Sequence, residues 1–568
     1  MKNKEIADIF FEIAEMMEIL GDNLFRINSY KKAARVLNDL TEDVELLSKE
    51  NKLKDIPGIG TGMAEKITQY IAERRIDKYE ELKREIPEGV IRLMEIPGMG
   101  PKTAQLVFKA LNITNIEDLQ KAVKEGKLRG LPGIGQKKEE AILKGIKIIK
   151  DLGNRILLGV ALPIVSEMVK KIKQNGAKLV SPAGSLRRMK ETVGDIDILV
   201  GDKDGRKIIS DFVRQGGVKE VLAVGDTKGR VIVEGGTQVD IRVVSPDCFG
   251  AALQYFTGSK EHNVRLREIA KTKGLKINEY GIFKGDNKIG GEKEEDIYEL
   301  LGIEWIPPVL REDRGEIEAA QTKKLPRLVA MEDIKCDLHV HSNWSDGTTE
   351  IMALAEEAER LGYTHIVISD HSQSLKIANG LDLKRIEAQI EEIKKINKDL
   401  KGFKLLCGSE VDIKADGSMD FPDSILKELD VVIGAIHTNF KQEKKVLTGR
   451  IIKAMENPNV DIIAHPTGRL IGAREAYDVD MNEIIKAAHN TKTALEINSH
   501  YDRLDLQDIW AHKAKENGVK MAIGTDAHHI DNLWMMRLGV GLAGRAWLEK
   551  KDILNTLSHD SLIKYLTN

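Results

Sequence analysis

The sequence has few cysteines, few aromatic residues and no histidine in its first 261 positions. Of 568 residues, 3 are Cys, 5% are aromatic and 13 are His. Three widely separated cysteines exclude a disulfide framework and argue against a thiolate zinc site, so a reducing compartment is expected. The crowding of imidazole into the second part of the chain indicates chemistry there that the first part performs without histidine.

Long hydrophobic runs are also missing. The longest, ILLGVALPIV at 156–165, is too short to span a bilayer, and the N-terminus alternates charged with apolar residues, unlike a signal peptide. A formal net charge of -3 excludes a strongly basic surface overall, so nucleic-acid binding must come from local patches. We therefore expect a cytoplasmic globular protein, long enough for several domains.

One turn occurs three times in the first 150 residues, as IPGIG (56–60), IPGMG (96–100) and LPGIG (131–135). Each copy precedes a helix-forming run, whose first amides can take a phosphate oxygen while the glycines allow close approach. One copy could be an ordinary helical hairpin, but three resemble the helix-hairpin-helix motif that grips the DNA backbone. The glycines expected at this surface are Gly58, Gly60, Gly98, Gly100, Gly133 and Gly135.

Aspartate alternates with isoleucine in GDIDILV (194–200). The strand period of two places Asp195 and Asp197 on one face, and Asp240 lies in a second alternating segment, TQVDIRVV. Three neighbouring carboxylates suit a pair of Mg²⁺ ions for phosphoryl transfer, whereas the alternative is a solvated acidic strand edge. Arg187 and Arg188 just upstream could hold a triphosphate and favour the catalytic interpretation.

Four segments, AGSLRR, VGDIDILV, VDIRVV and YFTGSKEHNVRLRE, resemble the palm and thumb of family X DNA polymerases, the group of DNA polymerase beta. The resemblance implies that the three aspartates bind metal. The residues that it places at the incoming nucleotide and the template are Ser185, Arg188, Gly194, Tyr255, Phe256, Gly258, Asn263 and Arg267. Gln238 departs from the well-studied animal members, which carry an arginine there, and this affects proton transfer at the primer end.

The N-terminal region is similar to the lyase domain of the same family. The resemblance implies a Schiff-base role for Lys66 and a position near a bound 5′-phosphate for Tyr30. However, Phe25 and Gly62 replace a histidine and a lysine that help to hold this phosphate in the family. A lyase and a plain DNA-binding helix with a surface lysine are both compatible with the sequence.

Residues 304–335 are highly charged and interrupted by proline, which predicts an extended linker. Beyond them, β-branched runs such as HIVISD, DVVIGAIH and VDIIAH alternate with helix-forming runs, as in an α/β barrel. Most of these strands end in histidine or an acid, and the strand ends of a barrel meet at one mouth. A lone histidine at such an end is usually not a ligand, but six of them with three acids indicate a metal cluster.

This half resembles the polymerase and histidinol phosphatase (PHP) domain, a distorted βα barrel that holds up to three metals. The implied ligands are His339, His341, Glu410 and Asp526 for one ion, Glu410, His437 and His465 for a second, and Asp346, His371 and His528 for a third. Mixed imidazole and carboxylate ligands fit Mn²⁺ or Zn²⁺ better than Mg²⁺. Asp337, Asp370 and Glu496 are expected to orient these ligands, and the other histidines to have no role in metal binding.

We therefore predict a multidomain fold with all-α helix-hairpin-helix regions, an α+β nucleotidyltransferase palm and thumb, and a C-terminal α/β distorted βα barrel. The expected boundaries are 1–90 for a lyase-like DNA-binding domain, 91–150 for fingers, 151–246 for the palm, 247–308 for the thumb, 309–334 for the linker and 335–568 for the PHP domain.

The resemblance implies a DNA polymerase that fills short gaps during repair, with two Mg²⁺ ions at the palm. The barrel, with Mn²⁺ or Zn²⁺, would be a 3′→5′ exonuclease that also cleaves at abasic sites. Expected partners are gapped or primer-template DNA and deoxynucleoside triphosphates, with no membrane and a monomeric state. The alternative is a DNA-binding scaffold with a small-molecule phosphatase and a relic polymerase, against which the three intact aspartates argue.

Overall fold

The structure, a computed structural model, describes residues 2–40, 42–94, 96–153, 155–233 and 236–567. The chain divides into two compact units, Met1–Gly153 with Gly472–Glu475, and Asn154–Ile471 with Ala476–Asn568. None of the helices in the described ranges combines the length and the hydrophobicity needed to cross a bilayer. The three cysteines are free and buried, which confirms that they form no disulfide framework.

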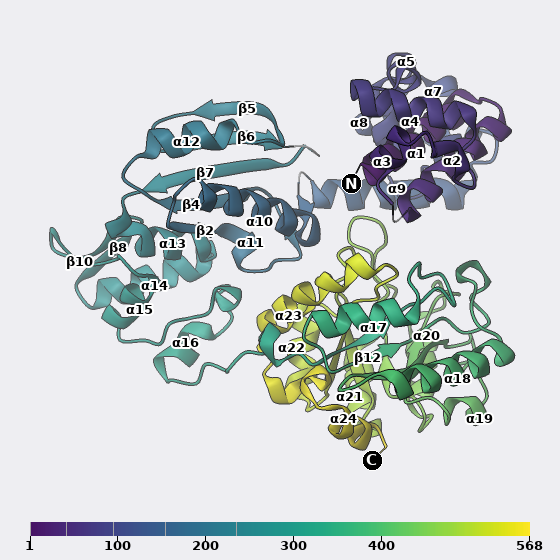
Figure 1. Cartoon of the computed structure of the whole chain (residues 1–568). Coiled ribbons are helices and arrows are strands. Elements are labelled where there is room, and N and C mark those ends of the chain that lie inside the picture. Colours follow the sequence, from purple (N-terminus) through teal and green to yellow (C-terminus); the bar gives the residue numbers. More distant parts are fainter. Residues whose placement is uncertain (1, 41, 95, 154, 234–235, 568) are drawn as a thin grey trace. The chain divides into compact units, whose positions relative to one another are not determined.

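The first unit, purple to blue in Figure 1, consists of helices joined by turns, with no strand among its described residues up to Gly153. Its helices are α1 (Asn3–Leu20), α2 (Leu24–Asp39), α3 (Val44–Lys49), α4 (Thr61–Glu73), α5 (Asp77–Glu85), α6 (Glu88–Leu93), α7 (Pro101–Leu111), α8 (Ile116–Lys124) and α9 (Gln136–Leu152). The buried faces of α1 and α2 supply much of one hydrophobic core, which includes Ile6, Phe10 and Leu37.

The three repeated turns lead into α4, α7 and α9. The first glycine of each, Gly58, Gly98 or Gly133, has a φ of +103°, +90° or +77°, a conformation that a β-carbon disfavours. The second glycine is the N-cap of the following helix and offers no side chain to the first amides. The predicted tight turns that lead into helices are therefore confirmed, and each leaves helix amides for an external acceptor.

The second unit begins with a five-stranded sheet in the order β2-β4-β7-β6-β5 (Figure 1). The strands are β2 (Leu179–Pro182), β4 (Ile196–Gly201), β5 (Val218–Val224), β6 (Lys228–Val233) and β7 (Gln238–Val244), with helices α10 (Leu158–Gln174), α11 (Gly184–Arg187) and α12 (Gly205–Val213). Strands β4 and β7 are parallel, and Asp197 pairs with Asp240. The alternating residues, such as Ile196 and Ile241, are buried.

The next elements are α13 (Phe249–Thr257), α14 (Lys260–Thr272), a three-stranded sheet of β8 (Leu275–Asn278), β9 (Gly281–Lys284) and β10 (Asn287–Gly290), and α15 (Glu294–Leu300). They share a hydrophobic core that extends to Ile317 and Ala320, which lie beyond residue 308. The region predicted as the thumb thus packs against residues that the sequence had assigned to a linker.

The prediction that residues 309–334 form an extended linker is wrong. They contain a helix, α16 (Glu316–Gln321), and the fully buried Glu316 lies 2.6 Å from His262 Nδ1 of α14. The equally buried Arg311 pairs with Glu294 at 2.5 Å. High charge density suggested exposure to solvent, but these charges are paired inside the fold, and such pairing depends on contacts distant in sequence.

The C-terminal half is a nearly closed barrel of seven parallel strands in chain order. They are β11 (Cys336–Val340), β12 (His365–Ile368), β13 (Lys404–Asp412), β14 (Val431–Ala435), β15 (Ile462–Ile463), β16 (Ala494–Asn498) and β17 (Met521–Gly524). Past the end of β17, the amide of His341 donates to Ala527 O and that of Asp526 to His339 O, each at 2.9 Å, which links the first strand to the last.

Figure 1 shows the helices of this half, drawn green to yellow, outside the strands. They are α17 (Ile351–Arg360), α18 (Leu383–Asp399), α19 (Asp423–Leu426), α20 (Lys444–Met455), α21 (Met481–Thr491), α22 (Asp508–Glu516), α23 (Met536–Arg545) and α24 (His559–Leu566). Strands covered by helices on one side and by barrel side chains on the other need no polar face. This explains the continuous apolar runs and confirms the predicted α/β barrel.

Glu316→Ala should destabilise the second unit by about 3 kcal/mol, because it leaves His262 buried without its partner. Glu318→Ala on the same helix should cost at most about 0.5 kcal/mol, since Glu318 is 54% exposed and pairs only with exposed Arg265. Urea unfolding measures both variants. Trypsin should also cut residues 309–334 of the Glu316 variant about a hundredfold faster than in the unsubstituted protein. Equal stability of the two variants would show that α16 is not held by this pair.

Candidate metal centres

Three aspartates meet at one end of the five-stranded sheet. Asp197 on β4 and Asp240 on β7 are direct neighbours, and Asp195 precedes β4 in a turn, not on the strand as the alternation predicted. Burial, followed by the charges of Asp195 and Asp240, raises the pKa of Asp197 to about 7. A divalent cation between these oxygens would remove the repulsion, so the group fits metal ions.

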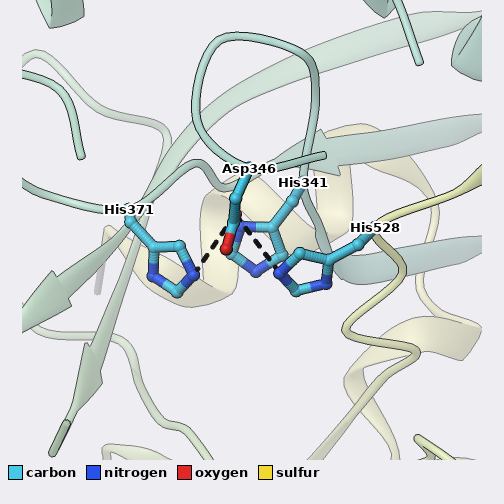
Figure 2. A group of neighbouring side chains, drawn as sticks. All are labelled: His341, Asp346, His371 and His528. Carbon is cyan, nitrogen blue, oxygen red and sulfur yellow. Dashed lines mark ion pairs between the residues drawn. The ribbon is translucent and has the colours of Figure 1, made fainter. Parts of the chain in front are cut away.

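The nine predicted barrel ligands converge at the C-terminal ends of the strands. Their ligand atoms form three sets, and within each set all the atoms lie within 4.8 Å of one another. The sets are His341, Asp346, His371 and His528; His339, His341 and Asp526; and His371, Glu410 and His437. In Figure 2, Asp346 lies between His371 and His528, whose Nε2 atoms are 3.6 and 3.3 Å from its Oδ1. The grouping differs from the expected one, because His341 and His371 each stand in two sets.

Glu410 is the common neighbour of five imidazoles although it is only 1% exposed. The nitrogen-to-carboxylate distances are 3.5 Å for His339, 3.6 Å for His341, 2.8 Å for His371, 3.2 Å for His437 and 2.8 Å for His465. Burial alone would raise its pKa, but the charges of His437, His371 and His339 outweigh burial and hold the pKa of Glu410 well below its usual range.

Some of these atoms are close to one another without forming a hydrogen bond. Glu410 Oε2 is buried and has no hydrogen-bond partner among the described residues, although His371 Nδ1 is 2.8 Å away. His339 Nε2 and His341 Nε2 face each other at 3.1 Å, a hydrogen bond in which one of the two nitrogens must be protonated and the other must offer its lone pair. Lone pairs that point at a shared space are what metal ligands present, so the barrel residues fit bound divalent ions.

Two ligands also have strained backbones. His465 and Asp526 have φ values of +29° and +54°, in the left-handed region that residues with a β-carbon rarely adopt. Strain of this kind concentrates at functional sites, where the surrounding fold must enforce it.

Four family models and several known proteins match this chain. Family models match residues 1–76 (helix-hairpin-helix domain), 90–147 (SAM-like helix-hairpin-helix tandem), 252–312 (DNA polymerase beta thumb) and 337–500 (PHP domain). The DNA polymerase/3′-5′ exonuclease PolX of Bacillus subtilis (strain 168) is 39% identical over 566 residues, which cover 98% of each chain. The chain belongs to the family X DNA polymerases with a PHP domain.

Two more distant relatives of this family X polymerase match only about half of the chain. DNA polymerase lambda of Rattus norvegicus is 28% identical over 55% of this chain and 56% of its own length, and that of Arabidopsis thaliana is 24% identical over 54% and 61%. The predicted family, fold class and enzyme class are confirmed: the protein is a DNA polymerase with a 3′→5′ exonuclease. The scaffold with a relic polymerase is not favoured.

Arg230, which sequence reasoning missed, holds the third palm aspartate of the polymerase. Arg230 lies on β6, directly opposite Asp240 of β7. Its Nε and Nη2 donate to the Asp240 carboxylate at 2.9 and 2.8 Å, and Gln238 donates to Oδ1 of the same carboxylate at 2.9 Å. Arg230 thus supplies from the neighbouring strand the guanidinium that Gln238 lacks. The signal was available, since alternation on β6 and β7 places both side chains on one face.

The nucleotide-binding residues that the resemblance implies are only partly grouped. A cavity of about 310 Å³ is lined by Asp197, Asp240 and Phe256. Asn263 on α14 donates to the carbonyls of Tyr255 and Gly258, at 2.7 and 3.2 Å.

Other residues expected around the nucleotide are placed less simply. Arg188 is not free, because it pairs with Glu312 at 3.0 Å and donates to Thr257 O. Ser185 is half-buried on α11, whereas Gly194 and Arg267 are exposed.

In the first unit, the two residues of the implied lyase site lie together. Lys66 Nζ is 5.9 Å from the centre of the Tyr30 ring and donates to Gly62 O at 3.1 Å. Phe25, which replaces the expected histidine, is 83% exposed.

The barrel ligands are oriented by residues that the sequence identified only in part. Glu496, as expected, lies 2.7 Å from His339 Nδ1. Asp412, which was missed, lies 3.0 Å from His437 Nδ1, although the strand period puts it on the same face as Glu410.

Two acids expected to orient ligands hold other groups. Asp337 accepts from the Thr525 hydroxyl and two backbone amides, and Asp370 accepts from the hydroxyls of Ser342 and Ser345. They brace the loops that carry the ligands and touch no imidazole among the described side chains.

The raised pKa of Asp197 predicts a pH-dependent metal requirement. Below its pKa of about 7 the carboxyl carries a proton that Mg²⁺ must displace, so the Mg²⁺ concentration for half-maximal primer extension should rise about tenfold per pH unit from 7 to 6. Above pH 7 it should level off. A constant Mg²⁺ requirement from pH 6 to 8 would contradict the prediction.

Proposed function

We propose that this family X polymerase fills short gaps in DNA, with catalysis at Asp195, Asp197 and Asp240. The observation that carries the proposal is the direct pairing of Asp197 with Asp240 beside an open cavity. Two Mg²⁺ ions bound there would neutralise the charge that develops during nucleotidyl transfer. The aspartates would hold these ions, and Arg230 would have to release Asp240 as they bind.

Substrate contacts follow from the residues around the cavity. Tyr255, Phe256 and Gly258 would face the sugar of a deoxynucleoside triphosphate, and Asn263 would touch the minor-groove edge of the incoming base. Ser185 and Arg188 would contact the triphosphate, with Gly194 packed beside them, and Arg267 would steady the template. Arg188 would exchange Glu312 for the triphosphate, since both offer an anionic oxygen to the same guanidinium.

DNA would be held without regard to sequence. Amides in the first helical turn after Gly60, Gly100 and Gly135 would donate to phosphates, with Lys102 as the first donor after Gly100 because Pro101 has no N–H. The conformations of Gly58, Gly98 and Gly133 support this arrangement. The protein would act as a monomer. Its domains would follow the boundaries given above, with 309–334 as a folded connector.

The barrel would use its own ions, Mn²⁺ or Zn²⁺, for the 3′→5′ exonuclease and for cleavage at abasic sites. Nitrogen-rich ligand sets favour these metals over Mg²⁺. Bound there, they would activate water and polarise the phosphate. Glu496 and Asp412 would keep His339 and His437 directed at the ions.

Because each site has its own ligands, the two activities should separate. Asp240→Ala should reduce primer extension at least a hundredfold and leave DNA hydrolysis nearly unchanged, whereas His339→Ala should do the reverse. Asp226→Ala is the matched control, an exposed aspartate of the same domain that pairs only with Arg206. Loss of both activities in a folded Asp240→Ala protein would refute the two-site proposal.

We further propose that Lys66 forms a Schiff base with a 5′-deoxyribose phosphate, as its position beside Tyr30 permits. Borohydride should trap a covalent adduct with incised abasic DNA, and Lys66→Ala should abolish it, because the primary amine is the nucleophile. Lys102→Ala, an exposed lysine in the second repeat, should trap normally. Undiminished trapping by the Lys66 variant would exclude this role.

A further inference from the structure

One arginine lies against the metal-binding groups of the barrel. Arg503 follows β16, its side chain is 19% exposed, and its Nε is 3.3 Å from Asp526 Oδ2. The guanidinium therefore lies in contact with one of the ligands at the mouth of the barrel.

Part of this guanidinium has nothing to bind within the described chain. Its Nη1 is buried and has no hydrogen-bond partner among the described residues. A buried donor without an acceptor costs about 1–3 kcal/mol, so a fold that keeps one in place needs a reason. Asp526 does not provide it, because its Oδ2 faces Nε of the guanidinium and leaves Nη1 without an acceptor.

The charge of the site supplies the reason. Glu410 and Asp526 are negative, but two or three divalent cations would make the cluster strongly positive. A permanent cation beside them would then be repelled, unless an anion lay between the guanidinium and the ions. A phosphodiester provides such an anion, and guanidinium donors match its oxygens in geometry.

We propose that Arg503 is a further catalytic residue of the barrel, whose Nη1 binds a non-bridging oxygen of the phosphate that is hydrolysed. In that reaction the bond between phosphorus and the 3′-oxygen breaks. Water supplies the hydroxyl that phosphorus gains and the proton that the leaving 3′-oxygen takes. Arg503 takes part in no proton transfer; it stabilises the charge on the phosphate oxygens as the new bond forms. This inference rests on the proposed exonuclease.

The test compares Arg503→Ala and Arg503→Lys with a control, Arg360→Ala, which removes a 71% exposed arginine from α17. Three quantities are measured on the full chain loaded with Mn²⁺: hydrolysis of a 5′-labelled oligonucleotide, metal content, and the affinity for thymidine 5′-monophosphate as a phosphate probe. Primer extension and thermal melting report on the rest of the molecule.

Arg503→Ala should lower kcat/KM for hydrolysis about a hundredfold and weaken binding of the monophosphate at least tenfold, with metal content and primer extension unchanged. Arg503→Lys should recover part of both losses, because it keeps the charge but not the fork of donors. The control should match the unsubstituted protein.

Reduced metal content in both Arg503 variants would overturn the proposal and make Arg503 a structural partner of Asp526. Unchanged hydrolysis and unchanged monophosphate binding would overturn it as well. If the unsubstituted protein failed to hydrolyse DNA, the exonuclease proposal would fall, whereas monophosphate binding would still decide the role of Arg503.

Discussion

A carboxylate buried among imidazoles is the constraint on which the C-terminal half depends. Glu410 keeps its negative charge at 1% exposure only because histidines from other strands surround it. Those histidines can reach it only if parallel strands end at one edge, and His339 and His341 reach Asp526 only because β11 and β17 close the ring. The topology and the chemistry of the barrel thus impose the same geometry.

The palm differs from the barrel, because its three carboxylates repel one another. Arg230 and Gln238 donate hydrogen bonds to Asp240, and the pKa of Asp197 is raised to about 7. Oxygen ligands alone suit hard ions that exchange readily, whereas imidazole-rich sets suit ions held more firmly. Two centres in one chain can therefore differ in metal without competing for it.

The sequence predicted what depends on local pattern and missed what depends on partners. Repeated glycine turns, apolar strand runs and histidines at strand ends are short-range signals, and the helices, the barrel and the nine clustered ligands follow from them. The prediction of an extended linker at 309–334 failed because Glu316 and Arg311 resemble solvated charges in the sequence. Only the structure shows that His262 and Glu294 face them. Arg503 was missed because an arginine in a sequence carries no indication of the anion it will meet. Arg230 could have been found from the alternation on its strand, but only together with the pairing of β6 with β7.

The folded connector also limits how such proteins can be recombined. Helix α16 completes the core of the thumb, so a crossover at residue 308 would leave Glu294 with Arg187 but without Arg311, and would leave buried His262 without Glu316. Exchange of barrels between relatives should be tolerated only after Leu328, because Leu325 and Leu328 still pack against the core of the thumb, whereas Val329 belongs to the core that includes the barrel. The border between the two catalytic halves therefore lies near the end of the segment that the sequence suggested to be a spacer.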